Sequence, residues 1–410
     1  MNRDKRRSFR AILSVLFLDN LGLTVVYPIF TPLVLKPIYT LLPPEYPLSM
    51  RLILLGVLIA SFPFAQFIAG PFIGHIADLK GRKFAFTLAL IGEGIGFLLT
   101  GLSIQMMNYP FLIFSRLFTG FFAGNMTICL AAISDITPDE KGRSRNIGIV
   151  SSVVGGSFVV AIVMGGTLSN DALNTFFNSS LPFWAMTLFS IINIIIISFR
   201  FKETHAECLQ QKHYFKEGCQ ELRKIFKEKN LKYLYGTFFF FMLGWVVSLQ
   251  FLSSFLIEHF MGTKLAITLT FVGVGLAWCI GNIGINQILV RFFKPGKILF
   301  YALLLSTLSL FISSEARTFL LFIHMIVIGG LSASIAWTNC LALISIKAPC
   351  YLQGKLLGIN QSVATISMAF APLFGGMVGE FDIRTIYFFA SGSLLISTAV
   401  LIIYKLKNRF

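Results

Sequence analysis

Long apolar runs separated by short polar segments repeat along the whole chain. A helix needs about 20 apolar residues to cross about 30 Å of hydrocarbon, and the chain contains twelve candidate runs, of which the ninth is short. In lipid only helices and closed barrels satisfy their backbone, and these runs are continuous rather than alternating, so the pattern predicts twelve membrane helices. They lie near 11–34, 51–77, 84–105, 110–135, 146–168, 181–200, 233–257, 265–290, 298–313, 318–346, 356–379 and 385–405.

One long polar stretch, Phe201 to Lys232, interrupts this pattern between the sixth and seventh runs. It is rich in Lys and Glu, and its apolar residues recur at roughly helical spacing, which predicts an amphipathic helix on the cytoplasmic membrane surface. The chain is therefore expected to divide into a six-helix bundle at 1–200, a linker at 201–232 and a second six-helix bundle at 233–410.

The composition agrees with a membrane protein and excludes several other classes. Of the 410 residues, 56% are hydrophobic and 13% are charged, whereas an average soluble domain is about 45–50% apolar and about 25% charged. A soluble enzyme, a nucleic-acid-binding protein and a secreted disulfide scaffold are all disfavoured. The six Cys residues show no paired spacing, so we expect no disulfide, no metal site and no cofactor.

The net charge of +16 is explained by membrane topology, without a nucleic-acid partner. If the N-terminus is cytoplasmic, the cytoplasmic segments hold 28 of the 34 Lys and Arg residues and the opposite loops hold five. Positive charge collects on the cytoplasmic side of membrane proteins, so both termini are expected there. The basic segment Arg3 to Arg10 leads into the first span with no cleavage site, and a bacterial inner membrane is the expected location.

The two halves contain an internal repeat. Gly148 to Gly166 matches Gly358 to Gly376 at a constant offset of 210, with eight identical pairs in 19 positions. Small residues are common where membrane helices pack closely, so composition accounts for some of the matches, but the regular register favours duplication. Paired halves are typical of secondary transporters, which bind substrate between the halves near mid-membrane.

The loop after the second run carries the clearest motif. It places Gly74, Asp78, Gly81, Arg82 and Lys83 at the spacing G-x-x-x-D-x-x-G-R-[KR]. A carboxylate beside a guanidinium at a helix junction makes a charge-assisted contact that can open and close, although the two cations also anchor the loop on the cytoplasmic side. The spacing resembles the signature loop of the major facilitator superfamily, and in that family it would serve as a cytoplasmic gate.

Two further motifs resemble the tetracycline/proton antiporters and drug-efflux members of that superfamily. The fourth run contains Arg116 and Gly120 in an R-x-x-x-G pattern, and the first run contains Asp19 and Asn20 within Leu18–Gly22. The fifth run departs from the antiporter pattern, because Ala161 and Ile162 stand where that group usually has Gly-Pro. That departure removes a helix-bending element and leaves the direction of transport open.

The resemblance implies an all-α membrane protein with twelve helices in two pseudo-symmetric bundles. It implies alternating access, with proton-coupled efflux of a drug-like or siderophore-like small molecule, and we expect a monomer. A proton-coupled importer of a nutrient or siderophore is the alternative. A membrane enzyme would need a cluster of His, Cys or carboxylates at one face, and a receptor on this fold would need an added soluble domain; neither is evident in the sequence.

Charged residues inside membrane spans are costly and are functional candidates. We expect Asp19 to be the proton site or a contact for a substrate cation; the alternative is a structural contact with Asn20 or a neighbouring helix. Arg116 is expected to act in conformational change or proton coupling, or else to be a fixed donor to exposed carbonyls. Glu93 in the third run is expected to be a structural partner. His324 in the tenth run is expected to be a packing residue, with a coupling role as the alternative.

Uncharged polar residues and one Trp in the spans are candidates for lining a central cavity, although such groups also join helices to each other. Scattered amides and aromatics with little fixed charge suit a moderately apolar or amphipathic solute. The candidates are Tyr27, Asn125, Gln250, Asn282, Asn286, Gln287, Trp337, Asn339, Asn360 and Gln361.

Overall fold

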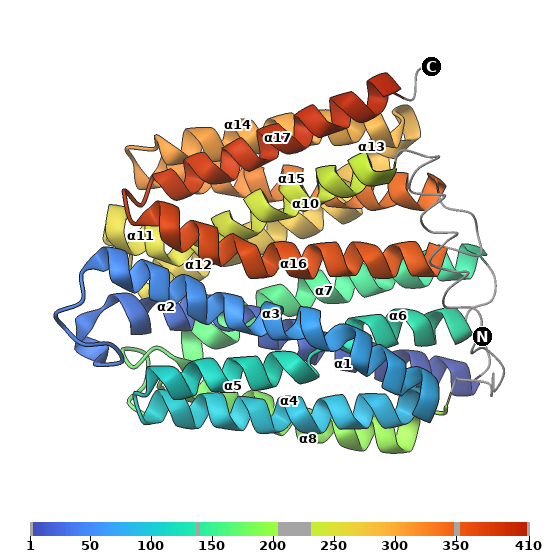
Figure 1. Ribbon diagram of the computed structural model, residues 1–410, viewed down its shortest axis with the longest axis horizontal. Coiled ribbons are helices and arrows are strands. Elements are labelled where there is room, and N and C mark those ends of the chain that lie inside the picture. The colour runs from blue at the N-terminus through green and yellow to red at the C-terminus, as the bar shows by residue number, and fades with distance from the viewer. Residues whose placement is uncertain (1–2, 137–139, 204–230, 348–352, 408–410) are drawn as a thin grey trace.

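The computed structural model describes residues 3–136, 140–203, 231–347 and 353–407, and all regular structure in these ranges is helical. Figure 1 shows two groups of helices packed side by side, α1 to α8 in one and α10 to α17 in the other. The first group comprises α1 (Arg3–Thr24), α2 (Tyr27–Leu35), the short 3₁₀ turn η1 (Pro37–Tyr39), α3 (Leu48–Lys80), α4 (Arg82–Gln105), α5 (Tyr109–Phe122), α6 (Asn125–Ile136), α7 (Glu140–Leu168) and α8 (Leu181–Arg200).

The second group follows the linker. It comprises α10 (Leu231–Gln250), α11 (Leu252–Phe260), α12 (Lys264–Cys279), the π-helical turn η2 (Ile280–Ile285), α13 (Asn286–Phe292), α14 (Pro295–Ser314), α15 (Phe319–Lys347), α16 (Gln353–Gly379) and α17 (Thr385–Lys407). The predicted all-α fold of two six-helix bundles is confirmed. The amphipathic helix expected in the linker falls at 204–230, outside the described residues.

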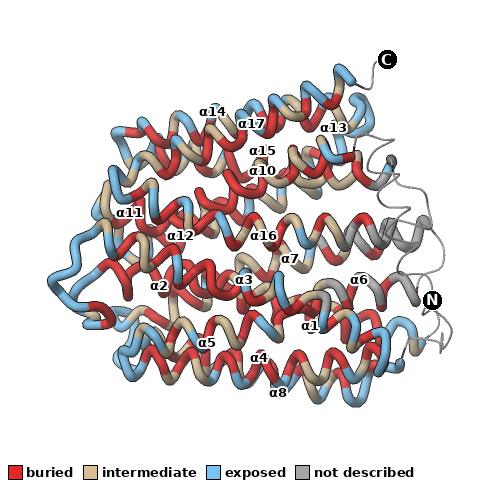
Figure 2. The backbone as a smooth tube through the Cα atoms, in the orientation of Figure 1, coloured by how far each residue is buried: buried red, intermediate tan, exposed pale blue. Residues whose placement is uncertain are grey.

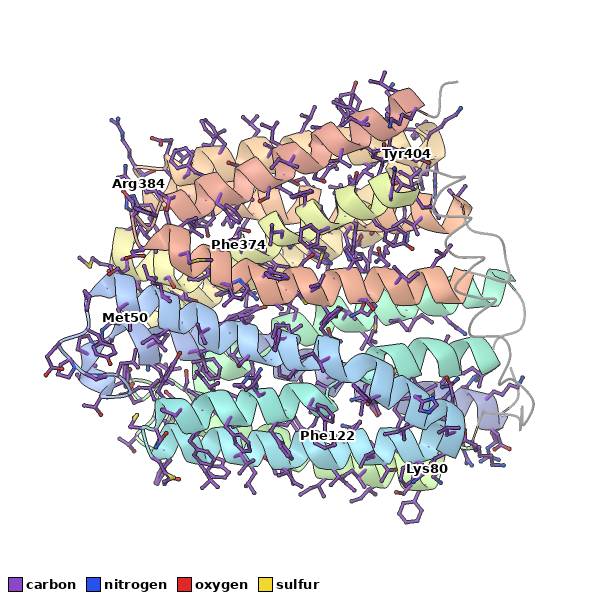
Figure 3. The ribbon with its side chains drawn as sticks, viewed as in Figure 1. Met50, Lys80, Phe122, Phe374, Arg384 and Tyr404 are labelled. Atoms are coloured by element: carbon purple, nitrogen blue, oxygen red, sulfur yellow. The ribbon has the colours of Figure 1, made fainter. Side chains whose placement is uncertain are left out.

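Both termini lie at the same end of the bundles, which we call the terminal end; the opposite end is the distal end (Figure 1). Met50 and Arg384 mark the distal end, and Lys80 and Tyr404 lie near the terminal end (Figure 3). This common end is required by an even number of spans.

The outer surface is apolar, as a lipid-facing surface must be. Large hydrophobic side chains are exposed on the outward sides of many helices, among them Phe72, Phe199, Leu269 and Leu395, while buried residues concentrate where helices face each other (Figure 2). By length and composition, ten helices in the described part of the chain are apolar enough to span a membrane. Two predicted spans are not among them: the fourth is divided into α5 and α6, of 14 and 12 residues, and the fifth is counted only as a shorter apolar helix, Ser152–Leu168.

Three spans that the sequence predicts as continuous are interrupted. The first breaks between Thr24 and Tyr27, the fourth at Ala123 and Gly124, and the seventh at Phe251. In the first span the break precedes Pro28, which has no N–H to donate to the Thr24 carbonyl. Each break leaves backbone groups that other parts of the protein must satisfy.

The repeated Gly-Gly pair occupies equivalent positions in the two halves. Gly165 in α7 packs against the Val25 carbonyl at the break of the first span, and Gly375 in α16 packs against Phe251 at the break of the seventh. The second glycine of each pair faces the other half: Gly166 lies against Thr268 of α12, and Gly376 lies against the Leu52 carbonyl of α3. A Cβ at either position would collide with its neighbour, so these glycines allow the two halves to close on each other.

These contacts gather toward the distal end. Gly56 of α3 meets the Pro372 carbonyl of α16 there, and the Ser253 hydroxyl donates to the Tyr27 carbonyl at 3.0 Å, joining the broken first and seventh spans. Nearer the terminal end, a Cβ added at Gly70 or Gly74 would meet no atom within 4 Å, and α3 diverges from α16 (Figure 1). The bundles are therefore closed against each other distally.

A polar tie reinforces the distal closure. Lys264, at the start of α12, donates to the Ser169 carbonyl at 3.0 Å and to the Asp171 carboxylate at 3.3 Å in the α7–α8 loop. The ammonium charge of Lys264 holds the pKa of Asp171 below its usual value. The ion pair is therefore fully formed at pH values above the usual pKa of an Asp side chain, and it is lost only as the pH falls through the lowered pKa of Asp171. It does not respond to pH changes near neutrality.

We expect Gly56→Ala to weaken distal closure, because its Cβ would strike the Pro372 backbone carbonyl. Overpacking of this kind costs about 1–3 kcal/mol. That is enough to raise the population in which the distal contact between the bundles is open about five-fold or more. The measurement is the rate at which an impermeant maleimide labels Thr268→Cys in a background without native cysteines. The control is Gly70→Ala on the same helix, where the added methyl group meets nothing; equal labelling of both variants would contradict the expectation.

Candidate functional site

A cavity of about 200 Å³ lies between the two bundles. Its walls come from broken or glycine-rich spans of both halves, chiefly α1, α7, α10, α12 and α16. The residues that line it are Asp19, Asn20, Leu23, Thr24, Tyr27, Gln66, Met126, Val150, Val154, Gly155, Phe158, Met242, Trp245, Val246, Leu249, Val274, Gly275, Trp278, Trp337, Gln361, Ala364 and Met368.

The wall from the second half is aromatic. Three of the four Trp residues of the chain line the cavity. The rings of Trp245 and Trp278 are stacked with centroids 5.9 Å apart, and Trp337 lies 6.3 Å from Trp278. Such a row offers flat apolar surfaces and ring faces that attract cations.

The wall from the first half carries the charge. Asp19 is the one ionisable acid or base among the described residues of this wall, apart from the phenol of Tyr27. Its side chain is 7% exposed. Neighbouring Asn20 also lines the cavity, and its amide donates to the Leu16 carbonyl one turn earlier in α1.

Asp19 belongs to a buried polar cluster that extends away from the cavity. The amide nitrogen of Asn125, the first residue of α6, donates to Glu93 Oε1 at 2.5 Å and to Asp19 Oδ1 at 3.4 Å. Glu93 stands on α4 between two glycines, and Gly92 lets the ring of Phe122 at the end of α5 pack directly on the helix (Figure 3). The structure thus brings Asp19 and Glu93 together, which sequence spacing could not indicate.

Arg116 lies in a separate position, on the distal side of this cluster. Its side chain is fully enclosed, Nη2 donates to the Gly22 carbonyl at 3.2 Å, and the guanidinium lies over the Phe62 ring at 4.5 Å and the Phe30 ring at 5.7 Å. No carboxylate pairs with it in the described part of the chain. Arg116 therefore binds a carbonyl near the end of α1, where the helix dipole favours a positive charge.

The break in the fourth span is satisfied by a residue of the second. Gln66 of α3 donates its side-chain amide to the Ala123 carbonyl, and the same side chain lines the cavity. Gln66 is not among the residues that stand out as candidates in the sequence. An amide within an apolar span is the signal that was available, but the broken helix it serves was not visible in the hydropathy pattern.

The motif loop forms a compact junction between α3 and α4. Arg82 donates to the Asp78 carboxylate at 2.7 Å, and Gly81 has φ +89°, a conformation that favours glycine. Lys83 donates to the Ser198 carbonyl at the end of α8 at 2.7 Å. Gly74, the first residue of the motif, lies earlier on α3, and a Cβ added there would meet no atom within 4 Å.

Glu203 completes this junction and was not selected from the sequence. Its two carboxylate oxygens accept the backbone N–H groups of Arg82 and Lys83, each at 3.0 Å. A carboxylate is favoured at a helix N-terminus, and here it caps α4 from a position 120 residues further along the chain. No local pattern marks such a distant cap.

Several predicted lining residues lie away from the cavity. Among the candidates from the sequence, Tyr27 and Trp337 line it. The side chains of Asn339 and Asn286 bond to each other at 2.6 Å, and Asn282 bonds to Thr338, so these amides join α15 to η2 and α13. Asn125, Gln250 and Asn360 are buried and do not line the cavity.

Of the other candidates from the sequence, one lines the cavity and the others lie away from it. Gln361 lines the cavity, while Gln287 does not. His324 is exposed on the outer surface of α15, where its Nδ1 bonds to the Leu320 carbonyl of the same helix. The described residues hold no group of three or more His, Cys, Asp or Glu side chains that could bind a metal ion.

Relatives of known type agree with this architecture. The chain is 25% identical over 411 residues to multidrug resistance protein 1 of Bacillus subtilis (strain 168), covering 98% of this chain and 97% of the relative. It is 26% identical over 240 residues to the class H tetracycline resistance protein of Pasteurella multocida, covering 58% of this chain and 55% of the relative.

Solved structures share the fold at low identity. A crystal structure of the human organic anion transporter MFSD10 matches with a TM-score of 0.73 and 16% identity, covering 98% of this chain and 100% of that one. A D-xylose–proton symporter matches with a TM-score of 0.77 and 14% identity, covering 96% and 97%. The sequence profile of the Major Facilitator Superfamily matches residues 12–349. The chain is thus a multi-pass membrane transporter that belongs to the Major Facilitator Superfamily.

Proposed function

We propose that this chain exports a flat, amphipathic, drug-like organic solute in exchange for protons. The observation that carries the proposal is the cavity between the bundles, which combines three Trp rings on one wall with a single buried carboxyl group, Asp19, on the other. The names of its relatives, a multidrug resistance protein and tetracycline resistance proteins, favour efflux over the alternative of import. A siderophore-like solute remains within this chemical class.

We also propose a membrane location and an orientation for the transporter. The bacterial relatives and the positive charge at the terminal end support an inner membrane with both termini in the cytoplasm. In that orientation, distal closure corresponds to a cavity that opens toward the cytoplasm. The proposed units are 1–200, the linker 201–232 and 233–410, acting as a monomer with a small-molecule substrate and protons as partners.

The position of Asp19 supports the proposed proton exchange. A carboxylate in a nearly dry wall is costly, and a proton removes that cost. A cationic or polar solute that enters the cavity competes with the proton for the same group, so the two travel in opposite directions. The contact of Arg116 with Gly22, one turn from Asp19 on α1, fixes the end of that helix.

We expect Trp278→Phe to weaken solute binding, because the stacked rings contribute about 0.5–1.5 kcal/mol per aromatic pair, about a two- to ten-fold change in Kd. Quenching of protein fluorescence by ethidium or tetracycline, in detergent-solubilised protein, measures it. Trp184→Phe is the matched control, because this fourth Trp lies at the distal end and not on the cavity. An unchanged Kd for Trp278→Phe would remove the aromatic wall from the proposal.

Asp19→Asn is expected to abolish transport driven by a pH gradient while leaving the folded protein in the membrane, because the amide cannot exchange a proton. The measurement is ethidium and tetracycline movement in proteoliposomes with an imposed pH gradient. Glu380→Gln, an exposed acid at the distal end, serves as the control and should transport like the wild type. Unimpaired pH-driven transport by Asp19→Asn would overturn the proposed function.

Arg116→Lys is expected to preserve folding and solute binding but to slow transport at least about ten-fold. A charge-assisted hydrogen bond contributes about 1.5–3 kcal/mol, and Lys cannot both reach the Gly22 carbonyl and stack on Phe62 as the planar group does. Arg51→Lys gives the contrast: Arg51 is also buried and binds three carbonyls, of Val34, Pro43 and Tyr46, far from the cavity. That variant should lose thermal stability while the turnover of the folded fraction is retained.

A further inference from the structure

Glu93 is a buried acid that the proposed function does not yet use. Its side chain is 1% exposed, and it stands in α4, behind the wall that carries Asp19. Gly92 and Gly94 on either side let α5 and α8 approach through Phe122 and Ser190. This close packing places the carboxyl group deep in the first bundle.

The contacts of Glu93 couple it to Asp19. Asn125 Nδ2 lies 2.5 Å from Glu93 Oε1 and 3.4 Å from Asp19 Oδ1, so one amide group serves both acids. Asp19 Oδ1 and Glu93 Oε1 therefore lie against the same amide nitrogen. Three elements, α1, α4 and α6, thus meet at a pair of acids.

The pair is short of hydrogen-bond donors. Glu93 Oε2 and Asn125 Oδ1 are both buried with no partner. The neighbouring groups do not supply one: Cys129 of α6 faces the Ile12 carbonyl, and Arg116 of α5 is held by Gly22. Neither acid forms a salt bridge in the described part of the chain.

A proton would resolve this shortage. Two ionised carboxylates side by side in a dry site repel each other and lack counter-charges, whereas one shared proton removes a charge and supplies the missing donor. A purely structural contact with Asn125 would not need an acid, because the amide of Gln has the same shape and can bond to Asn125 equally well.

We propose that Glu93 and Asp19 form a single two-carboxyl proton site, bridged by Asn125, in which Asp19 is the outer member and Glu93 the inner member. This inference rests on the proposed proton coupling. A proton from water in the cavity binds the Asp19 carboxylate and is shared with Glu93. It leaves by the same oxygen of Asp19 when the cavity opens to the other side, so no other bond is made or broken.

Infrared difference spectroscopy of the full-length protein in detergent tests the proton site without a solute. Raising the pH from about 5 to about 9, across the range where perturbed carboxyl groups titrate, should remove a carbonyl-stretch band of a protonated carboxyl in the wild type. Glu93→Gln and Asp19→Asn should each abolish or shift that band, since the proton belongs to the pair. A band unchanged in Glu93→Gln would overturn the two-carboxyl site.

Transport by the same variants gives a second, independent readout. We expect Glu93→Gln to reduce ethidium and tetracycline transport driven by a pH gradient at least about ten-fold, Glu93→Asp to restore part of it with an altered pH profile, and Glu380→Gln to change nothing. The double variant with Asp19→Asn should be no worse than the worse single variant, because residues that act as a unit are not additive.

The outcomes separate this inference from the proposed function. If Asp19→Asn abolishes pH-driven transport but Glu93→Gln keeps the wild-type rate and pH profile, Glu93 is structural and the inference fails while the function stands. If both variants transport normally, the proposed function fails as well. A sodium gradient that drives transport in place of the pH gradient would overturn the proton site in favour of a cation held by the same oxygens.

Discussion

The backbone of a membrane span has no water to complete its hydrogen bonds, and this constraint organises the whole molecule. The first, fourth and seventh spans are interrupted, and each interruption is met from another helix. In the first span Arg116 donates to the Gly22 carbonyl and Ser253 to the Tyr27 carbonyl, in the fourth Gln66 donates to the Ala123 carbonyl, and in the seventh the hydroxyl of Tyr387 on α17 donates to the Ser248 carbonyl. All three interrupted spans border the cavity or support its wall, so the groups that stabilise the breaks also hold the site in shape.

The two halves use equivalent residues where they pack against each other, but different residues where they line the cavity. The Gly-Gly pairs at 165–166 and 375–376 each pack on the broken span of their own half and on a helix of the other half, so the same contact occurs once in each half. The cavity walls have diverged: the first bundle contributes the acid, and the second contributes the Trp row. Duplication therefore accounts for how the halves meet, and divergence accounts for what they bind.

The sequence predicted the fold because lipid leaves few solutions: apolar length fixed the spans, and the distribution of Lys and Arg favoured a common side for both termini. It also singled out Asp19 and Arg116, since charges inside spans are costly enough to be conspicuous. It did not reveal which amides face the cavity, because a helix turns 100° per residue and an error of one position moves Asn282 or Asn339 from the wall to a helix contact. Glu203 was missed because its partners are distant in sequence.

The pairing of Glu93 with Asp19 illustrates the same limit and its mechanical consequence. Asn125 binds both acids and is the first residue after the break in the fourth span, so its position depends on how α5 and α6 are joined. The other side of that break is tied by Gln66, which itself touches the cavity. A solute that displaces Gln66 would therefore move the residue that bridges the acids, and that provides a physical route by which the solute site and the proton site can affect each other.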